Sequence, residues 1–327
     1  MSDRYVLLHG GALGDLALTL QLALRLPSVE RTGLLVISRT DPGDLTACRP
    51  SIARRSSETV GLHWLFADDQ HPAPATLLSL IAGQRVINAL GGPDTSIHRR
   101  LLRLGPTALY SFDARARPDA ERHISEQWRS QLEAQGLLIP KCIHQRQQQR
   151  GLGVPESLRA GGRTLLAAGR PVSSALASGQ SSEGRQRVVL MHPGSGGRNK
   201  CWPLPHFVDL ADALTAMDQT EVHFVVGPVE LETWPGPTVE ALGRRFALHS
   251  QLSADDLVAL LSAVDVFVGN DAGPTHLAAL LGTPTVAVFG PTSPTVWKPT
   301  GPVVRAVAAP GGWPSRQEVE NVVRELL

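Results

Sequence analysis

Residues 269–294 read GNDAGPTHLAALLGTPTVAVFGPTSP, and this stretch decides the fold. It follows the apolar run 264–268, which is typical of a buried parallel strand. A turn of small residues then opens a helix over 276–281, which Gly-Thr-Pro at 282–284 stops, and 285–289 is a second strand. A strand that ends against a helix start presents backbone N–H groups and the positive end of a helix dipole, so the pattern predicts an anion site.

Two side chains beside this predicted anion site can hydrogen-bond a sugar. Asp271 follows the first strand, and His276 stands at the start of the helix. Amides that bind an anion, next to a carboxylate and an imidazole, favour a nucleotide-sugar site.

Length and composition limit the possible functions. The chain has 327 residues, which indicates about two domains, and its net charge of +1 gives no reason to expect nucleic-acid binding. Cys48, Cys142 and Cys201 are far apart, so we expect reduced thiols in a cytoplasmic protein rather than disulfides or a zinc site. The sequence shows neither the apolar core of a signal peptide nor a membrane-spanning run.

Strand and helix signals alternate in both halves of the chain, which predicts an α/β fold with parallel sheets covered on both faces. The expected strands outside the opening stretch are 5–9, 34–38, 85–89, 108–112, 188–192 and 222–226. The expected helices are 15–26, 97–104, 120–135, 205–216, 255–263 and 317–327.

Composition places the domain boundary near the middle. Residues 169–187 are rich in Ser, Gly and Ala and poor in large apolar residues, which predicts a linker or mobile loop. We therefore expect an N-terminal domain over 1–168 and a C-terminal domain over 188–327. The terminal helix could pack back on the N-terminal domain.

The first turn, HGGALGD at 9–15, allows three interpretations. It could be a dinucleotide fingerprint, but that motif needs G-x-G-x-x-G, and alignment on Gly11 and Gly14 leaves His9 at the first glycine. Arg39, at the end of the next strand, would then favour a 2′-phosphate. It could also be a purely structural turn. The third interpretation makes Asp15 a general base, because ligands of open α/β sheets bind beyond the carboxyl ends of strands.

A second loop, HPGSGGRNKCWPLPHF at 192–207, carries polar groups suited to a phosphate. Ser195 and the amides of 194–197 could form a nest, and Arg198 and Lys200 could neutralise charge, although the same residues could also form a solvated turn. Glu230 follows the next strand and could accept from a ribose, or be an exposed acid at a helix start.

Three blocks of the sequence resemble glycosyltransferase family 9, the ADP-heptose:lipopolysaccharide heptosyltransferases. They are GALGDLALTL at 11–20, MHPGSGGRNKCWPLPHFVDLADAL at 191–214 and LVALLSAVDVFVGNDAGPTHLAALLGTPTVAVFGPTSP at 257–294. The resemblance implies a GT-B fold of two Rossmann-like domains that face a central cleft. The C-terminal domain would bind the nucleotide sugar and the N-terminal domain the acceptor, in an inverting transfer that needs no metal or other cofactor.

The resemblance also implies residue roles. Asp15 matches the catalytic base, and Lys200 matches the lysine that stabilises the leaving diphosphate. The candidate acceptor-binding residues are Gly14, beside Asp15, and His123, which opens an amphipathic helix of the first half. The candidate donor-binding residues are Ser195, Gly196, Glu230, Asp271, Ala272, Gly273 and His276.

This sequence departs from the family pattern after Asp271, where Ala272 replaces the usual Thr or Ser and removes a hydroxyl. Alternatives therefore stay open: a different donor sugar, an acceptor outside lipopolysaccharide, a nucleotide-sugar-binding protein without transferase activity, or hydrolysis or epimerisation of a nucleotide sugar. The expected partners are an ADP-linked donor and a lipid-linked or oligosaccharide acceptor. A lipid-linked acceptor would bring the protein into peripheral contact with the cytoplasmic face of the inner membrane.

Overall fold

The computed structural model describes residues 4–26, 28–67, 71–116, 120–139, 151–170 and 186–327. The chain forms two compact units, Met1–Gln145 and Arg146–Leu327, and each is described by itself. The sequence places the end of the first domain at residue 168, which lies within the second of these units. Most of the expected linker, at 171–185, lies outside the described residues, as does Cys142.

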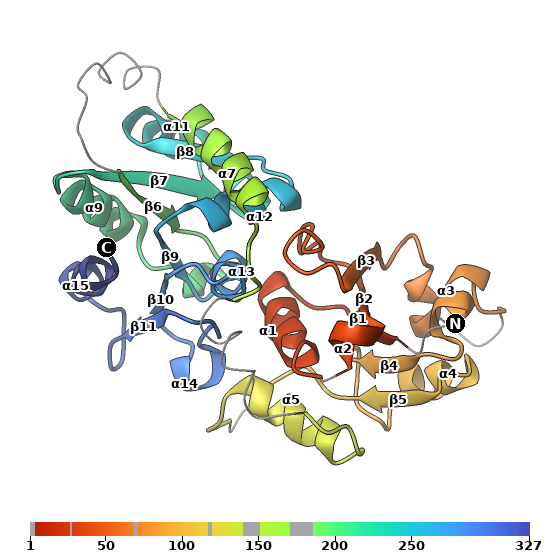
Figure 1. Cartoon of the computed structure of the whole chain (residues 1–327). Helices are drawn as coiled ribbons and strands as arrows, with labels where there is room; N and C mark the ends of the chain where they lie inside the picture. The colour runs from red at the N-terminus through yellow and green to blue at the C-terminus, as the bar shows by residue number, and fades with distance from the viewer. Residues whose placement is uncertain (1–3, 27, 68–70, 117–119, 140–150, 171–185) are drawn as a thin grey trace. The chain divides into compact units, whose positions relative to one another are not determined.

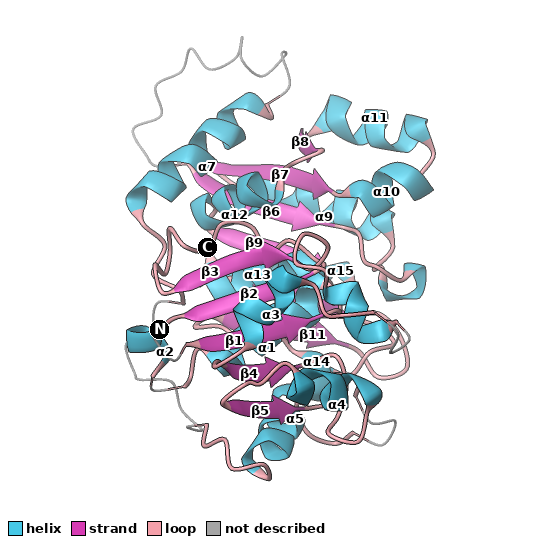
Figure 2. Cartoon of the chain, turned by 90° about the vertical axis from the view of Figure 1, so that its right-hand side faces the viewer, coloured by secondary structure: helices cyan, strands magenta, loops and turns pink. Residues whose placement is uncertain are grey.

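The first unit is built on a five-stranded parallel sheet in the order β3-β2-β1-β4-β5 (Figures 1 and 2). Its apolar strands form where the sequence predicts them, but β3, with two arginines in five residues, is not apparent in the sequence. The strands are β1 Tyr5–His9, β2 Leu34–Ser38, β3 Ile52–Ser56, β4 Arg85–Asn88 and β5 Ala108–Ser111.

Helices cover both faces of the first sheet. One apolar layer packs the 3-10 helix η1 Leu62–Phe66, α3 Ala75–Ile81 and α4 Ser96–Arg103 against alternate residues of the strands. The remaining helices are α1 Leu13–Ala23, α2 Val29–Thr32 and α5 Ile124–Glu133, and α5 packs on α1. Helix α1 thus begins two residues before Asp15, in a turn without a side-chain cap.

The second unit has a six-stranded parallel sheet in the order β11-β10-β9-β6-β7-β8 (Figure 1). The two expected strands of the opening stretch are present as β9 and β10, although β9 runs on through Asn270. The strands are β6 Arg187–His192, β7 Thr220–Val226, β8 Ala247–Ser250, β9 Val266–Asn270, β10 Thr285–Phe289 and β11 Val304–Ala308.

Helices also lie on both faces of the second sheet, as Figure 1 shows. The helices are α7 Glu156–Ala168, α9 Leu204–Thr215, α10 Pro228–Thr233, α11 Gly236–Arg245, α12 Ala254–Ala263, α13 Gly273–Leu281, α14 Pro294–Trp297 and α15 Arg316–Leu326, with a 3-10 turn η2 Arg198–Lys200. Phe207, Leu210, Val319 and Val323 of α9 and α15 join the core of this unit. The terminal helix α15 packs on α9 and on the second sheet.

Helix α7 explains the position of the boundary. It packs along α12, and a side chain at Gly162 would overlap the Ala259 carbonyl, so glycine permits the close approach. The sequence indicated helix only near 164–168 and placed it in the first domain. Across the described ranges, no helix is both long and apolar enough to cross a membrane.

Each sheet has one point where the chain order reverses. It lies between β1 and β4 in the first unit and between β6 and β9 in the second. Open α/β sheets bind ligands beyond the carboxyl ends of their strands at such a point. We therefore expect a ligand site at the turns that follow these four strands.

Candidate functional site

The second unit joins two loops at its reversal point through the side chain of Asn270. This residue is fully buried, and its amide donates to the carbonyls of Pro193 (2.9 Å) and Gly194 (3.2 Å). Its carbonyl accepts from the backbone N–H of Trp202 at 2.9 Å. The loop after β6 is thus tied at both ends to the end of β9. The sequence suggested only a turn at Asn270.

Asp271 lies at the centre of the resulting cluster. Its carboxylate Oδ2 accepts from Lys200 Nζ at 3.3 Å, and its Oδ1 lies 3.3 Å from His276 Nε2. Its backbone carbonyl accepts from the Ser195 hydroxyl at 3.1 Å. The fold therefore brings together four of the residues that the sequence singled out, of which Ser195 and Asp271 are 76 positions apart.

The environment of Asp271 keeps it ionised. Burial alone would raise the pKa of this carboxyl, but the hydrogen bond and charge of His276 and the charge of Lys200 hold the pKa below its ordinary value. Asp271 is 7 % exposed, whereas the Lys200 side chain is 37 % exposed. The lysine can therefore leave this pair for an incoming anion more easily than the aspartate can.

Helix α13 begins directly after Asp271. It runs from Gly273 to Leu281, and no side chain caps its N-terminus at Ala272. The helix starts three residues earlier than the sequence indicated. Backbone amides at an uncapped helix start attract anions. Ala272 and Gly273 thus stand where the sequence analysis placed an anion site.

The side chain of Glu230 lies against the loop after β6, next to Gly194. It is buried in the first turn of α10, and its Oε2 accepts from the backbone N–H of Gly227 at 2.7 Å and lies 3.6 Å from His192 Nε2. A side chain at Gly194 would overlap the Glu230 carboxylate. The alternative interpretation of Glu230 as an exposed acid at a helix start is thus wrong.

The pKa of Glu230 reflects this position. Burial works to raise it, but the contact with His192, its charge and the Gly227 N–H together hold it below its ordinary value. A buried carboxylate therefore stands directly behind the glycine loop. Gly196, by contrast, is exposed, and a side chain there would meet no atom within 4 Å.

The remaining predicted residues belong to the first unit. Asp15 lies in the first turn of α1, next to Gly14, and its backbone carbonyl accepts from the Thr19 hydroxyl at 2.7 Å. His123 is the N-cap of α5, where its ring nitrogen Nδ1 accepts from the Ser125 N–H. His123 therefore has a structural part in the start of that helix.

Across the residues with described positions, no group of three or more His, Cys, Asp or Glu could hold a metal ion. Metal-independent catalysis stays a prediction. Cys48 and Cys201 are both thiols in the structure.

Comparison with known proteins identifies similar sequences. Residues 119–324 match the family model of glycosyltransferase family 9 (heptosyltransferase). A lipopolysaccharide heptosyltransferase 3 of Escherichia coli is 29% identical over 123 residues, which are 35% of this chain and 34% of that protein. A lipopolysaccharide heptosyltransferase 1 of Campylobacter coli is 27% identical over 118 residues, 33% of this chain and 32% of that protein. The chain thus matches about a third of the length of these relatives.

Solved structures match over nearly the whole chain. A glycosyl transferase family 9 structure from Veillonella parvula superposes with a TM-score of 0.67 at 16% identity, and covers 99% of this chain and 97% of that one. The E. coli heptosyltransferase WaaC with ADP gives a TM-score of 0.64 at 18% identity, over 99% and 100% of the two chains. At this identity the likeness shows the fold, and it confirms the α/β, GT-B-like architecture expected from the sequence.

Proposed function

Because this chain belongs to glycosyltransferase family 9 (heptosyltransferase), we propose that it transfers a heptose, or a related sugar, from an ADP-heptose-type donor to an acceptor of the lipopolysaccharide core. The observation that carries the proposal is the cluster at the start of α13, where Lys200 and His276 flank the Asp271 carboxylate. One end of this cluster suits a diphosphate and the other suits sugar hydroxyl groups.

The donor diphosphate would lie against the N-terminus of α13. The amides of Ala272 and Gly273 would donate to it, with His276 beside them. Ser195 and Gly196 would contact it from the loop after β6: the Ser195 hydroxyl would donate to a phosphate oxygen in place of the Asp271 carbonyl, beside the Gly196 N–H. Lys200, which is partly exposed, would turn from Asp271 to the diphosphate and stabilise the charge that develops as the bond to the sugar breaks.

Asp271 would orient the sugar. With Lys200 engaged by phosphate, the ionised carboxylate can accept hydrogen bonds from two sugar hydroxyls while His276 holds its other side. Glu230, in the first turn of the helix after β7, would accept from the ribose of the nucleotide through its carboxylate next to Gly194. Both acids are buried, so each is held in one position before the donor arrives.

Asp15 would act as the general base, with Gly14 and His123 near the acceptor. The acceptor oxygen attacks the anomeric carbon and forms the new C–O bond, while Asp15 takes the proton from that hydroxyl. The bond from the anomeric carbon to the diphosphate breaks, and its electrons leave with the nucleoside diphosphate. The configuration inverts, and no metal or other cofactor takes part.

The proposed acceptor also sets a location. We propose a cytoplasmic protein. If its core acceptor is still linked to lipid, the protein would contact the cytoplasmic face of the inner membrane peripherally. The similar E. coli heptosyltransferase WaaC has been solved with ADP and with ADP-2-deoxy-2-fluoro heptose, which supports an ADP-linked donor here.

The test is a thermal-shift comparison of ADP, GDP, UDP, CMP and NADPH. A nucleotide at about 100 times its Kd should stabilise the protein by about 2.7 kcal/mol. We expect a selective shift with ADP and a further shift with ADP-heptose. Asp271→Ala should lose the further shift, whereas Asp218→Ala, which removes an exposed carboxylate of the same unit, should keep it.

Other outcomes would redirect the proposal. A shift with another nucleotide alone would change the donor, and a shift with NADPH alone would overturn the proposal. Tight binding of ADP-heptose without turnover on any acceptor would favour a binding protein without transferase activity.

A further inference from the structure

The loop after β10, residues 290–294, brings a further side chain to the surroundings of Asp271. Strand β10 pairs in parallel with β9, so this loop leaves the same edge of the sheet as Asp271 does. Burial works to raise the pKa of the Asp271 carboxyl, and the hydrogen bond and charge of His276 and the charge of Lys200 lower it. The Thr292 hydroxyl adds to this lowering of the pKa, so it stands next to the carboxylate.

The Thr292 hydroxyl is held in reserve. Its oxygen is buried, and among the described residues it has no partner at normal hydrogen-bond geometry. A buried hydroxyl without a partner costs free energy, so it takes up a hydrogen bond when an acceptor becomes available. The carboxylate beside it is such an acceptor, but its Oδ2 already accepts from Lys200 Nζ at 3.3 Å.

Packing fixes the loop that carries Thr292. Gly290, at the start of this loop, packs against the ring of Trp313, and a Cβ added at the glycine would lie 2.6 Å from that ring. Trp313 precedes α15 and packs on the apolar core of the second unit. The loop therefore cannot move away from Asp271 without breaking a close-packed contact.

The same segment before α15 also supports the loop after β6. The carbonyl of Pro314 accepts from Trp202 Nε1 at 3.0 Å, and Trp202 follows Lys200 by two residues. Residues 313–314 thus contact both loops that flank Asp271. The lysine and the threonine reach one carboxylate from two loops that share a support.

Donor binding under the proposed function would change the partners of Asp271. Lys200 would turn to the diphosphate, so the carboxylate would lose a charged hydrogen bond when it has to orient the sugar. His276 would remain beside Oδ1. The Thr292 hydroxyl, which has no other partner to give up among the described residues, can then donate to the carboxylate in place of the lysine.

We propose that Thr292 is a positioning residue of the donor site, whose hydroxyl replaces Lys200 on the Asp271 carboxylate when the lysine moves to the diphosphate. Thr292 acts through Asp271 and does not itself touch the donor. The carboxylate therefore stays ionised and keeps its orientation while it accepts from the sugar hydroxyls. The inference rests on the proposed function, because it describes the same donor site during sugar binding.

The test compares Thr292→Val, which keeps the shape and removes the hydroxyl, with Thr292→Ser, which keeps the hydroxyl. Calorimetric titration measures the Kd of the full-length protein for ADP and for ADP-heptose. We expect Thr292→Val to bind ADP-heptose about tenfold more weakly, because the sugar excludes water from a carboxylate that has lost its donor. The Kd for ADP should change little, because water can reach the carboxylate where the sugar would lie.

Two further variants complete the comparison. Thr292→Ser should bind both ligands as the wild type does. Thr295→Val removes an exposed hydroxyl from α14 and should change neither Kd. An unchanged Kd for ADP-heptose in Thr292→Val would overturn the inference. An equal loss for ADP and ADP-heptose would also overturn it, because the loop would then hold the nucleotide and not Asp271.

A second readout needs no donor. In the free protein, Thr292→Val should raise the pKa of the Asp271 carboxyl, and Thr292→Ser should not, which NMR titration of labelled aspartate detects. An unchanged pKa in Thr292→Val would remove the contact on which the inference depends. A wild type that binds ADP-heptose no more tightly than ADP would instead contradict the proposed function, and the inference would fall with it.

Discussion

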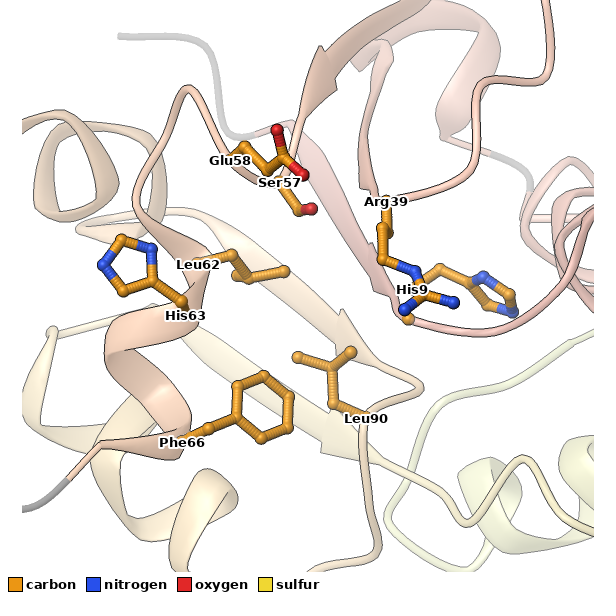
Figure 3. A pocket seen from close by; sticks show the side chains of 9 residues that line it. His9, Arg39, Ser57, Glu58, Leu62, His63, Phe66 and Leu90 are labelled. Carbon is orange, nitrogen blue, oxygen red and sulfur yellow. The ribbon is translucent and has the colours of Figure 1, made fainter.

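The two units present the same edge of a parallel sheet, yet their polar groups differ in how far they are satisfied. In the second unit, Asn270 ties the loops together, and Asp271 already has Lys200 and His276 as partners. In the first unit, His9 and Arg39 line a cavity (Figure 3) without partners among the described side chains. Under the proposed function, the second edge is pre-organised for the donor, whereas the His9 ring of the first edge has no such partner among the described residues.

The largest expected effect is on kcat, through Asp15 of the first unit, and it should leave donor binding by the second unit unchanged. Asp15→Asn should lower kcat about 10²–10⁴-fold, because the amide cannot take the proton of the acceptor hydroxyl. The measurement is ADP release in the presence of a lipopolysaccharide-core acceptor. The Kd for ADP should not change, because the proposed donor site lies in the second unit. Near-normal turnover of Asp15→Asn would remove this aspartate from the mechanism.

Lowering the pH should reduce the stability of the two units alike, although their candidate sites differ. His9 in the first unit and His249 in the second each have a pKa of about 4, chiefly because of burial. Each folded unit therefore binds fewer protons than its unfolded chain, so stability falls as pH drops from about 6.5 to 4. The loss should approach about 3 kcal/mol per histidine.

Hydrogen exchange measured at several pH values can follow each unit separately. His9→Gln should flatten the pH dependence of the first unit only, and His249→Gln that of the second only. His249 also shares a 2.9 Å hydrogen bond with His223, so His249→Gln should cost stability at neutral pH as well. An unchanged slope in either variant would contradict the neutral, buried state of that ring.

The sequence predicts those elements that carry a local signal and misses those that do not. Strand β9, helix α13 and strand β10 were evident because apolar runs and a Gly-Thr-Pro stop are local signals. Strands β3, β8 and β11 were missed because each is short and carries charged, polar or exposed side chains instead of a continuous apolar run. The sequence placed Lys200, Asp271 and His276 in one site, and the structure brings them together.

Other features depend on contacts that no spacing reveals. The amide of Asn270 reaches residues 76 and 77 positions away, so a local pattern suggests only a turn. His9 looked like a missing glycine of a nucleotide motif, and only its burial shows that both ring nitrogens lack partners. The packing of helix α7 on α12, in the second compact unit, is visible only in the fold.

The pre-organisation of the second edge can be weakened through Asn270. Asn270→Ala would leave the Trp202 N–H and the carbonyls of Pro193 and Gly194 without their partner in a buried site. We expect a loss of about 2 kcal/mol in the free energy of unfolding. Chemical denaturation of the variant measures this, with Asn199→Ala, an exposed amide on the same loop, as the control. Equal stability of both variants would show that the loop is held by other contacts.

The smallest effect concerns the shape of that loop. Gly194→Ala places a methyl group against the buried Glu230 carboxylate, so either the loop or the acid must move, at a cost of about 1–3 kcal/mol. Gly196→Ala in the same loop meets no atom within 4 Å and should be nearly neutral. Because Glu230 is tied to Gly227 and His192, we expect the loop to yield, which would shift Ser195 from the diphosphate and weaken ADP binding. Calorimetric titration with ADP distinguishes the outcomes: unchanged affinity in Gly194→Ala would mean that the acid moves instead, and that the loop, not Glu230, is the rigid element of this edge.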